Sequence, residues 1–145
     1  MLTLGADILP ATFAALRSCG GGERECVAYW LGPRDEPDRV DEVLQPEHDA
    51  SPFHYEVDAD WLNRFFLDLR ATRKSVRAQV HTHPGSSVEH SPTDDSFALA
   101  PSRGFVSLVL PHFAMGEITL DGAYSAVITE AGWTDVAPAD LIRWN

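Results

Sequence analysis

The spacing of hydrophobic residues predicts helices with one apolar face. Residues 58–73, DADWLNRFFLDLRATR, carry five large apolar side chains at the three- and four-residue steps of a helix face, which indicates core packing. These are Trp61, Leu62, Phe65, Phe66 and Leu69. Asp58 suits the N-cap of this helix. A second helix is expected from about Pro10 to Arg17, with Pro10 in its first turn.

Other segments are rich in β-branched and aromatic residues and predict strands. They are ECVAYWLG (25–32), RVDEVLQP (39–46), FHYEVD (53–58), SVRAQVHTHP (75–84), GFVSLVLP (104–111) and two or three weaker strands within 116–145. Residues 91–100, SPTDDSFALA, predict a further short helix. We find no repeat, low-complexity tract or linker. The pattern predicts one α/β (α+β) domain over residues 1–145, with a mixed, mostly antiparallel sheet flanked by helices.

Composition and charge narrow the classes of partner. The 145 residues are 44% hydrophobic, which is typical of a globular domain. Eleven Lys and Arg against 22 Asp and Glu give a formal charge of −11, which disfavours nucleic acid and anionic membranes as partners. A macromolecule with a basic face fits better, although on composition alone a role in solubility is the simpler explanation.

Two cysteines, Cys19 and Cys26, do not form a CxxC pair or a larger set. We therefore expect two reduced thiols in a cytoplasmic protein. The first residues lack a basic region, and Asp7 interrupts their apolar run, so we expect neither a signal peptide nor a membrane span.

The densest chemistry lies in residues 78–97, AQVHTHPGSSVEHSPTDDSF. Side chains two apart on a strand project to the same face, so His81 and His83 can bind one ion. Asp94, in the first turn of the following helix, can supply a third ligand and leave a fourth position for water, as in catalytic zinc sites. Zinc is the favoured metal, and other divalent ions also accept such ligands.

A simpler explanation accounts for part of the same window. Ser91 suits an N-cap, Pro92 a first helical position and Asp94 the third position of a capping box, all without a metal. Capping does not explain the HxH pair just upstream, so the pattern favours a metal site. A hydrolase also needs a base for the water, and no HExxH segment supplies one. The spacing leaves four candidates open, namely Glu23, Glu25, Glu56 and Glu89.

Taken together, the segments HTHP and SPTD form an HxH-x7-SxxD pattern, which resembles the signature of the JAMM (MPN-plus) zinc metallopeptidases. An upstream E-x6-G element of that family is matched by ECVAYWLG, from Glu25 to Gly32. The resemblance covers roughly residues 8–115 and is specific, because it fixes several polar residues at set spacing. It implies the JAMM/MPN (cytidine deaminase-like) architecture, with a curved sheet between helices.

The resemblance also implies a role for each matching residue. His81, His83 and Asp94 would bind one catalytic Zn²⁺, and Glu25 would act as general base and then protonate the leaving amine. Ser91 would donate a hydrogen bond to the oxyanion. His90 and Asp95 match no motif position.

Family members cleave isopeptide or peptide bonds at the C-terminus of ubiquitin-like or sulfur-carrier proteins. The resemblance therefore implies a ubiquitin-like protein substrate, for precursor maturation or deconjugation, in a bacterial pathway with E1-like and E2-like enzymes. The chain lacks the insertion that linkage-specific eukaryotic members carry after SxxD, so we expect weak linkage selectivity.

The sequence also bears on three other functions. A non-catalytic interaction scaffold of the same fold is disfavoured, because no motif residue is missing. A peptidase for sulfur-carrier or other small substrates stays open. A RadC-like role in DNA repair is disfavoured, because such members carry Asn where this chain has Thr82, and because of the acidic charge.

Overall fold

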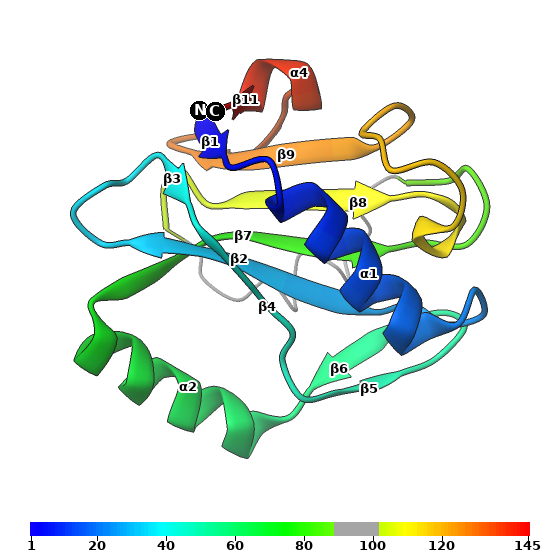
Figure 1. The fold of residues 1–145 in the computed structure, drawn as a ribbon, viewed down its shortest axis with the longest axis horizontal. Helices are drawn as coiled ribbons and strands as arrows, with labels where there is room; N and C mark the ends of the chain where they lie inside the picture. The colour runs from blue at the N-terminus through cyan, green and yellow to red at the C-terminus, as the bar shows by residue number, and fades with distance from the viewer. Residues whose placement is uncertain (89–101) are drawn as a thin grey trace.

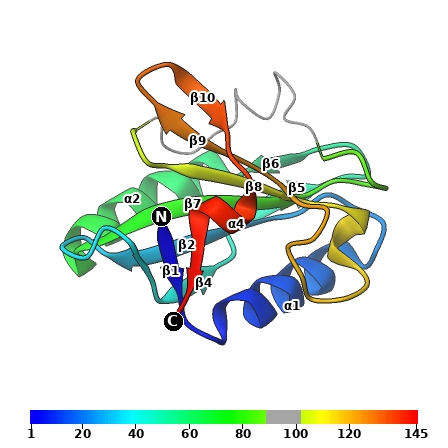
Figure 2. The same cartoon turned by 90° about the horizontal axis from the view of Figure 1, so that it is seen from above.

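The computed structural model describes residues 1–88 and 102–145. Within these residues, six strands form the main sheet in the order β10-β9-β8-β7-β2-β4. Figure 1 labels the strands from β9 to β4, and Figure 2 labels β10 beside β9. Their bounds are β2 Val27–Pro33, β4 Glu42–Leu44, β7 Lys74–Thr82, β8 Val106–Leu110, β9 Tyr124–Thr129 and β10 Gly132–Asp135. Neighbours pair antiparallel except β7 and β8, which run parallel. The mixed, mostly antiparallel sheet predicted from the sequence is confirmed.

Two helices cover opposite faces of this sheet (Figure 2). Helix α1, Ile8–Gly20, packs on one face through Phe13 and Leu16, against Trp30 and other buried strand residues. Helix α2, Ala59–Thr72, packs on the other through Phe65 and Leu69. Consecutive strand residues alternate between the two clusters, as the pleat requires. The central strands are therefore buried on both faces, with β2 and the last five residues of β7 nearly inaccessible.

Smaller elements complete the described fold. Strands β1 Leu2–Leu4, β3 Arg39–Val40 and β11 Ile142–Trp144 form a parallel sheet, which joins the two ends of the chain. Strands β5 His48–Ala50 and β6 Tyr55–Val57 form a hairpin. A 3-10 turn η1, His112–Ala114, and a short helix α4, Pro138–Leu141, lie in the last third.

Gly32 explains the final position of the E-x6-G element. A Cβ built on this residue would lie 1.8 Å from the backbone oxygen of Arg39, at the start of β3. Two backbones therefore approach too closely for any side chain, and only glycine fits between β2 and β3.

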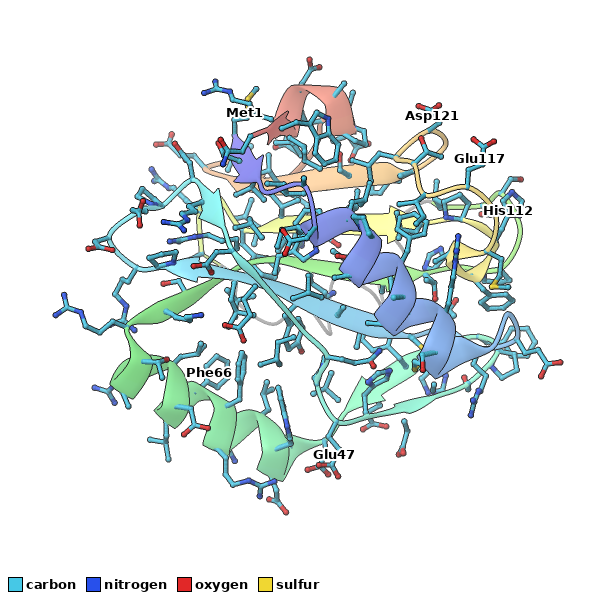
Figure 3. The ribbon with its side chains drawn as sticks, viewed as in Figure 1. Met1, Glu47, Phe66, His112, Glu117 and Asp121 are labelled. Carbon is cyan, nitrogen blue, oxygen red and sulfur yellow. A yellow bond between two sulfur atoms is a disulfide. The ribbon has the colours of Figure 1, made fainter. Side chains whose placement is uncertain are left out.

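The structure confirms one local prediction from the sequence and changes two others. Helix α2 begins after Asp58, whose carboxylate accepts a hydrogen bond from the Trp61 N–H at 2.8 Å, so the predicted N-cap is confirmed. Phe66, labelled at α2 in Figure 3, was expected on the buried stripe. It is 40% exposed, because its position lies at the margin of that stripe. The predicted strand over 39–46 is two short strands in different sheets. The helix expected over 91–100 lies outside the described residues.

Candidate metal centre

Strand β7 ends by placing two imidazole rings together. His81 is its penultimate residue and fully buried, and His83 follows its end and is partly exposed. Their Nε2 atoms lie 3.2 Å apart and their ring centroids 5.0 Å apart. The strand alternation predicted this pairing, and it follows from the local extended backbone.

The distance between these nitrogens suits a shared metal ion. A tetrahedral zinc ion with Zn–N bonds of 2.0–2.1 Å separates two ligand nitrogens by roughly 3.3 Å. The Nδ1 atom of His83 lies 3.2 Å from the carbonyl oxygen of Ser87. Because a carbonyl only accepts hydrogen bonds, this contact places the proton of a neutral ring on Nδ1 and turns the Nε2 lone pair toward His81. The pair is thus arranged as metal-ligating histidines are.

Glu25 precedes β2 at the same end of the sheet and is 5% exposed. Val27 is registered opposite His81, and Cys26 and Thr82 exchange hydrogen bonds, from Cys26 N–H to Thr82 Oγ1 and from Thr82 N–H to the Cys26 carbonyl. Continuing this antiparallel alternation brings the Glu25 position beside His83, on the face that carries both imidazoles. A buried carboxylate needs polar or charged partners, and a metal-bound water would be one of them.

Burial also separates Glu25 from the other candidate bases. Glu23 lies in the exposed turn after α1, and Glu56 faces solvent on β6. Glu89 lies outside the described residues. Of the three described candidates, only Glu25 is buried at the histidine end of the sheet, which is what a base shielded from bulk water requires.

Tyr55 is a neighbour of the histidines that the sequence did not indicate. Its ring centroid lies 5.4 Å from that of His81 and 6.2 Å from that of His48, and the residue is buried. The hairpin β5–β6 brings it there, and the backbone carbonyl of Ser51 in the same hairpin accepts a 2.7 Å hydrogen bond from the Glu25 N–H. The pattern FHYEVD predicts the strand but not the surface on which it packs.

Two predicted site residues, Ser91 and Asp94, lie outside the described residues, as do His90 and Asp95. The structure thus brings Glu25, before β2, to the same end of the sheet as His81 and His83, at the end of β7, while Ser91 and Asp94 stay predictions from the motif.

The expectation of two reduced thiols is wrong, because Cys19 and Cys26 form a disulfide with Cα atoms 6.3 Å apart. The last turn of α1 delivers Cys19 to the start of β2, a meeting that depends on how the helix packs on the sheet. His48 of β5 lies alongside, with Nε2 3.4 Å from Cys19 Sγ. Among the described residues these three also bring possible ligand atoms within 4.8 Å of one another, a cluster distinct from the histidine pair.

Comparison with known proteins identifies the class to which this fold and site belong. Residues 12–134 match the family of prokaryotic homologues of the JAB domain. The chain is 32% identical over 150 residues to "Probable metalloprotease y4jG" of Sinorhizobium fredii (strain NBRC 101917 / NGR234), covering 98% of this chain and 91% of the relative. The chain belongs to the prokaryotic JAB-domain family, the JAMM type of metalloprotease fold expected from the motif.

Solved structures support the same architecture. The protein DSY2949 of Desulfitobacterium hafniense matches with a TM-score of 0.67 and 22% identity, over 100% of this chain and 93% of that chain. AF2198, a JAB1/MPN domain protein of Archaeoglobus fulgidus, matches with a TM-score of 0.53 and 16% identity over 93% of each chain. At these identities the likeness concerns the fold. No helix in the described part of the chain is long and apolar enough to cross a membrane.

Proposed function

We propose that this protein is a zinc-dependent peptidase in which His81, His83 and Asp94 hold one Zn²⁺ and Glu25 acts as general base. One observation carries the proposal: the two Nε2 atoms oppose each other at 3.2 Å, at the end of the sheet where Glu25 is buried. Family membership and a relative named as a probable metalloprotease support it.

The bound ion would supply Lewis acidity and lower the pKa of its water. The chain's own residues do the rest. His83 is oriented through its Nδ1 contact with the Ser87 carbonyl, and His81 is fixed by burial within β7. Glu25 accepts the proton of the attacking water and returns it to the leaving amine. Ser91 donates its hydroxyl to the oxyanion, a charge that develops only as the bond is attacked.

We further propose a substrate class, the extended C-terminal tail of a ubiquitin-like protein, cut in precursor maturation or in deconjugation beside E1-like and E2-like enzymes. The resemblance to JAMM deubiquitinase-like peptidases motivates this choice. The charge of −11 favours a substrate with a basic face and disfavours nucleic acid.

The test uses the zinc-loaded protein and a ubiquitin-like protein that ends in Gly-Gly followed by a short C-terminal extension. Wild type should release the extension. Glu25→Gln should lose roughly 100- to 10,000-fold in rate while retaining the metal, because the base is lost and the ligands are intact. The matched control is Glu56→Gln, which changes an exposed carboxylate and should leave the rate unchanged.

Metal analysis completes the test. Removal of zinc by a chelator should abolish cleavage, and returning zinc should restore it. Cleavage by Glu25→Gln at the wild-type rate, or cleavage indifferent to the chelator, would refute the mechanism. Release of a peptide extension from a sulfur-carrier protein, without release from a ubiquitin-like one, would replace the substrate class and keep the chemistry.

A further inference from the structure

The disulfide lies beside Glu25 and is unequally accessible at its two sulfurs. Cys19, in the last turn of α1, is partly exposed, whereas Cys26 at the start of β2 is 0% exposed. The six intervening residues include Gly21 and Gly22, whose φ angles of 59° and 77° suit glycine and let the chain reverse tightly. An incoming reagent therefore reaches Cys19 before Cys26.

His48 lies where its imidazole can exchange a proton with the sulfurs of the disulfide. Its Nδ1 atom lies 2.8 Å from the carbonyl oxygen of Pro46, which assigns the proton of the neutral ring to Nδ1. Its Nε2 atom, with the free lone pair, faces Cys19 Sγ at 3.4 Å and lies within 4.8 Å of Cys26 Sγ. An imidazole in this position can take a proton from an approaching thiol and return it to a departing sulfur.

Hydrogen bonds of Cys26 and ring contacts of His48 connect the disulfide to the surroundings of the candidate metal centre. The Cys26 N–H donates to Thr82 Oγ1, and the Cys26 carbonyl accepts from the Thr82 N–H; Thr82 lies between the two histidines, and Glu25 immediately precedes Cys26. On the other side, the rings of His48, Tyr55 and His81 follow one another at centroid distances of 6.2 and 5.4 Å. The disulfide thus anchors the end of α1 to the strand start that positions Glu25.

From these contacts we propose that Cys19–Cys26 is a thiol–disulfide exchange site for a low-molecular-weight thiol, with Cys19 as the attacked sulfur and His48 as its acid–base group. Opening the bond frees residues 20–25, the segment that leads into Glu25. The exchange site does not depend on the peptidase assignment. That opening the bond disturbs Glu25 as the catalytic base does rest on the proposed function.

The exchange balances in two steps. In the first step, His48 takes the proton of the first thiol, and the sulfur of that thiol attacks Cys19 Sγ. The S–S bond breaks, and its electron pair passes to Cys26 Sγ. Cys26 Sγ then takes the proton from His48. A second thiolate attacks the small-molecule sulfur of this mixed disulfide and releases Cys19, which is protonated in turn. Two thiols are oxidised to one small disulfide, and the protein gains two thiols; the reverse uses that small disulfide.

The test equilibrates the full-length, zinc-loaded protein with mixtures of reduced and oxidised glutathione, traps thiols by alkylation and locates them by mass spectrometry. Both thiols should appear together, with a transient glutathione adduct on Cys19. Cys26→Ser should collect that adduct stably, and Cys19→Ser should form far less on Cys26. His48→Gln should slow exchange by roughly 100-fold or more, whereas His54→Gln, at an exposed histidine at the tip of the same hairpin, should leave the rate unchanged.

Limited trypsin digestion gives an independent readout of the segment. Arg24 is exposed, and its guanidinium donates to the Cys19 carbonyl at 3.0 Å, so reduction should speed cleavage after Arg24 several-fold. Three results would overturn the proposal: a pair that stays oxidised in excess reduced glutathione, an adduct mainly on Cys26, or a reduced pair that holds a second zinc ion and cannot re-form the bond. Absence of peptidase activity in both redox states would count against the proposed function alone.

Discussion

Gly32→Ala offers a direct test of the contact between β2 and β3. The added Cβ would lie 1.8 Å from the Arg39 carbonyl oxygen and 2.9 Å from its carbonyl carbon, whereas ordinary contacts begin near 3.4 Å. The obstacle is backbone, so no side-chain rotation relieves it. Arg39 is in turn registered with Thr3 of β1, and displacing it disturbs the small sheet that closes the chain ends.

The expected cost follows from overpacking. Extra methyl groups forced into a packed site cost about 1–3 kcal/mol, and occasionally more. A clash with the backbone of Arg39 belongs at the upper end of that range, about 3 kcal/mol. For a domain of this size each kcal/mol lowers the melting temperature by about 2–4 °C, so we expect a fall on the order of 10 °C.

Calorimetry and urea unfolding at neutral pH measure this change. The matched control is Gly20→Ala, where the new Cβ would meet Cys26 Sγ at an ordinary 3.5 Å, inside a helix that favours alanine. That variant should be neutral or slightly stabilising. Surface substitutions usually change the free energy of unfolding by no more than about 0.5 kcal/mol. If Gly32→Ala changes the free energy of unfolding by no more than this, the close approach of β2 and β3 does not require glycine.

Three further predictions concern buried polar contacts, a helix cap and alkaline pH. Thr12→Val should cost about 1–3 kcal/mol in urea unfolding, because the buried Trp30 Nε1–H now donates to Thr12 Oγ1 at 2.8 Å and would lose its acceptor; an unchanged midpoint would contradict this. Asp58→Ala should cost about 1 kcal/mol by removing the cap of α2, whereas Asp58→Asn should recover most of it. Burial raises the pKa of the Tyr29 phenol, so its contribution to stability is complete below the unfolded value of about 10 and is lost as pH rises toward the folded value. Tyr29→Phe should therefore flatten the loss of stability above about pH 10, and an unaltered alkaline limb would refute this assignment.

The sequence predicted those elements whose hydrophobic pattern and capping residues lie within one short segment. The apolar stripe and Asp58 predicted α2, and the alternation around His81 and His83 predicted that two imidazoles would share a face. Short-range sterics and side-chain periodicity fix such features, so few distant contacts are needed. The short strands β1, β5 and β11 carried little signal, because their pairing partners, and not their own residues, define them.

The sequence alone determined the family, the fold class and the histidine pair, because motif spacing and hydrophobic period are properties of the chain itself. Spacing left four glutamates open as the base, and the family resemblance pointed to Glu25. The pairing of β2 with β7 places Glu25 buried at the histidine end of the sheet, whereas Glu23 and Glu56 are exposed. Tertiary structure alone joined Cys19 to Cys26 and brought Tyr55 to His81. Those contacts depend on how α1 and the β5–β6 hairpin pack on the sheet, which local propensity does not encode.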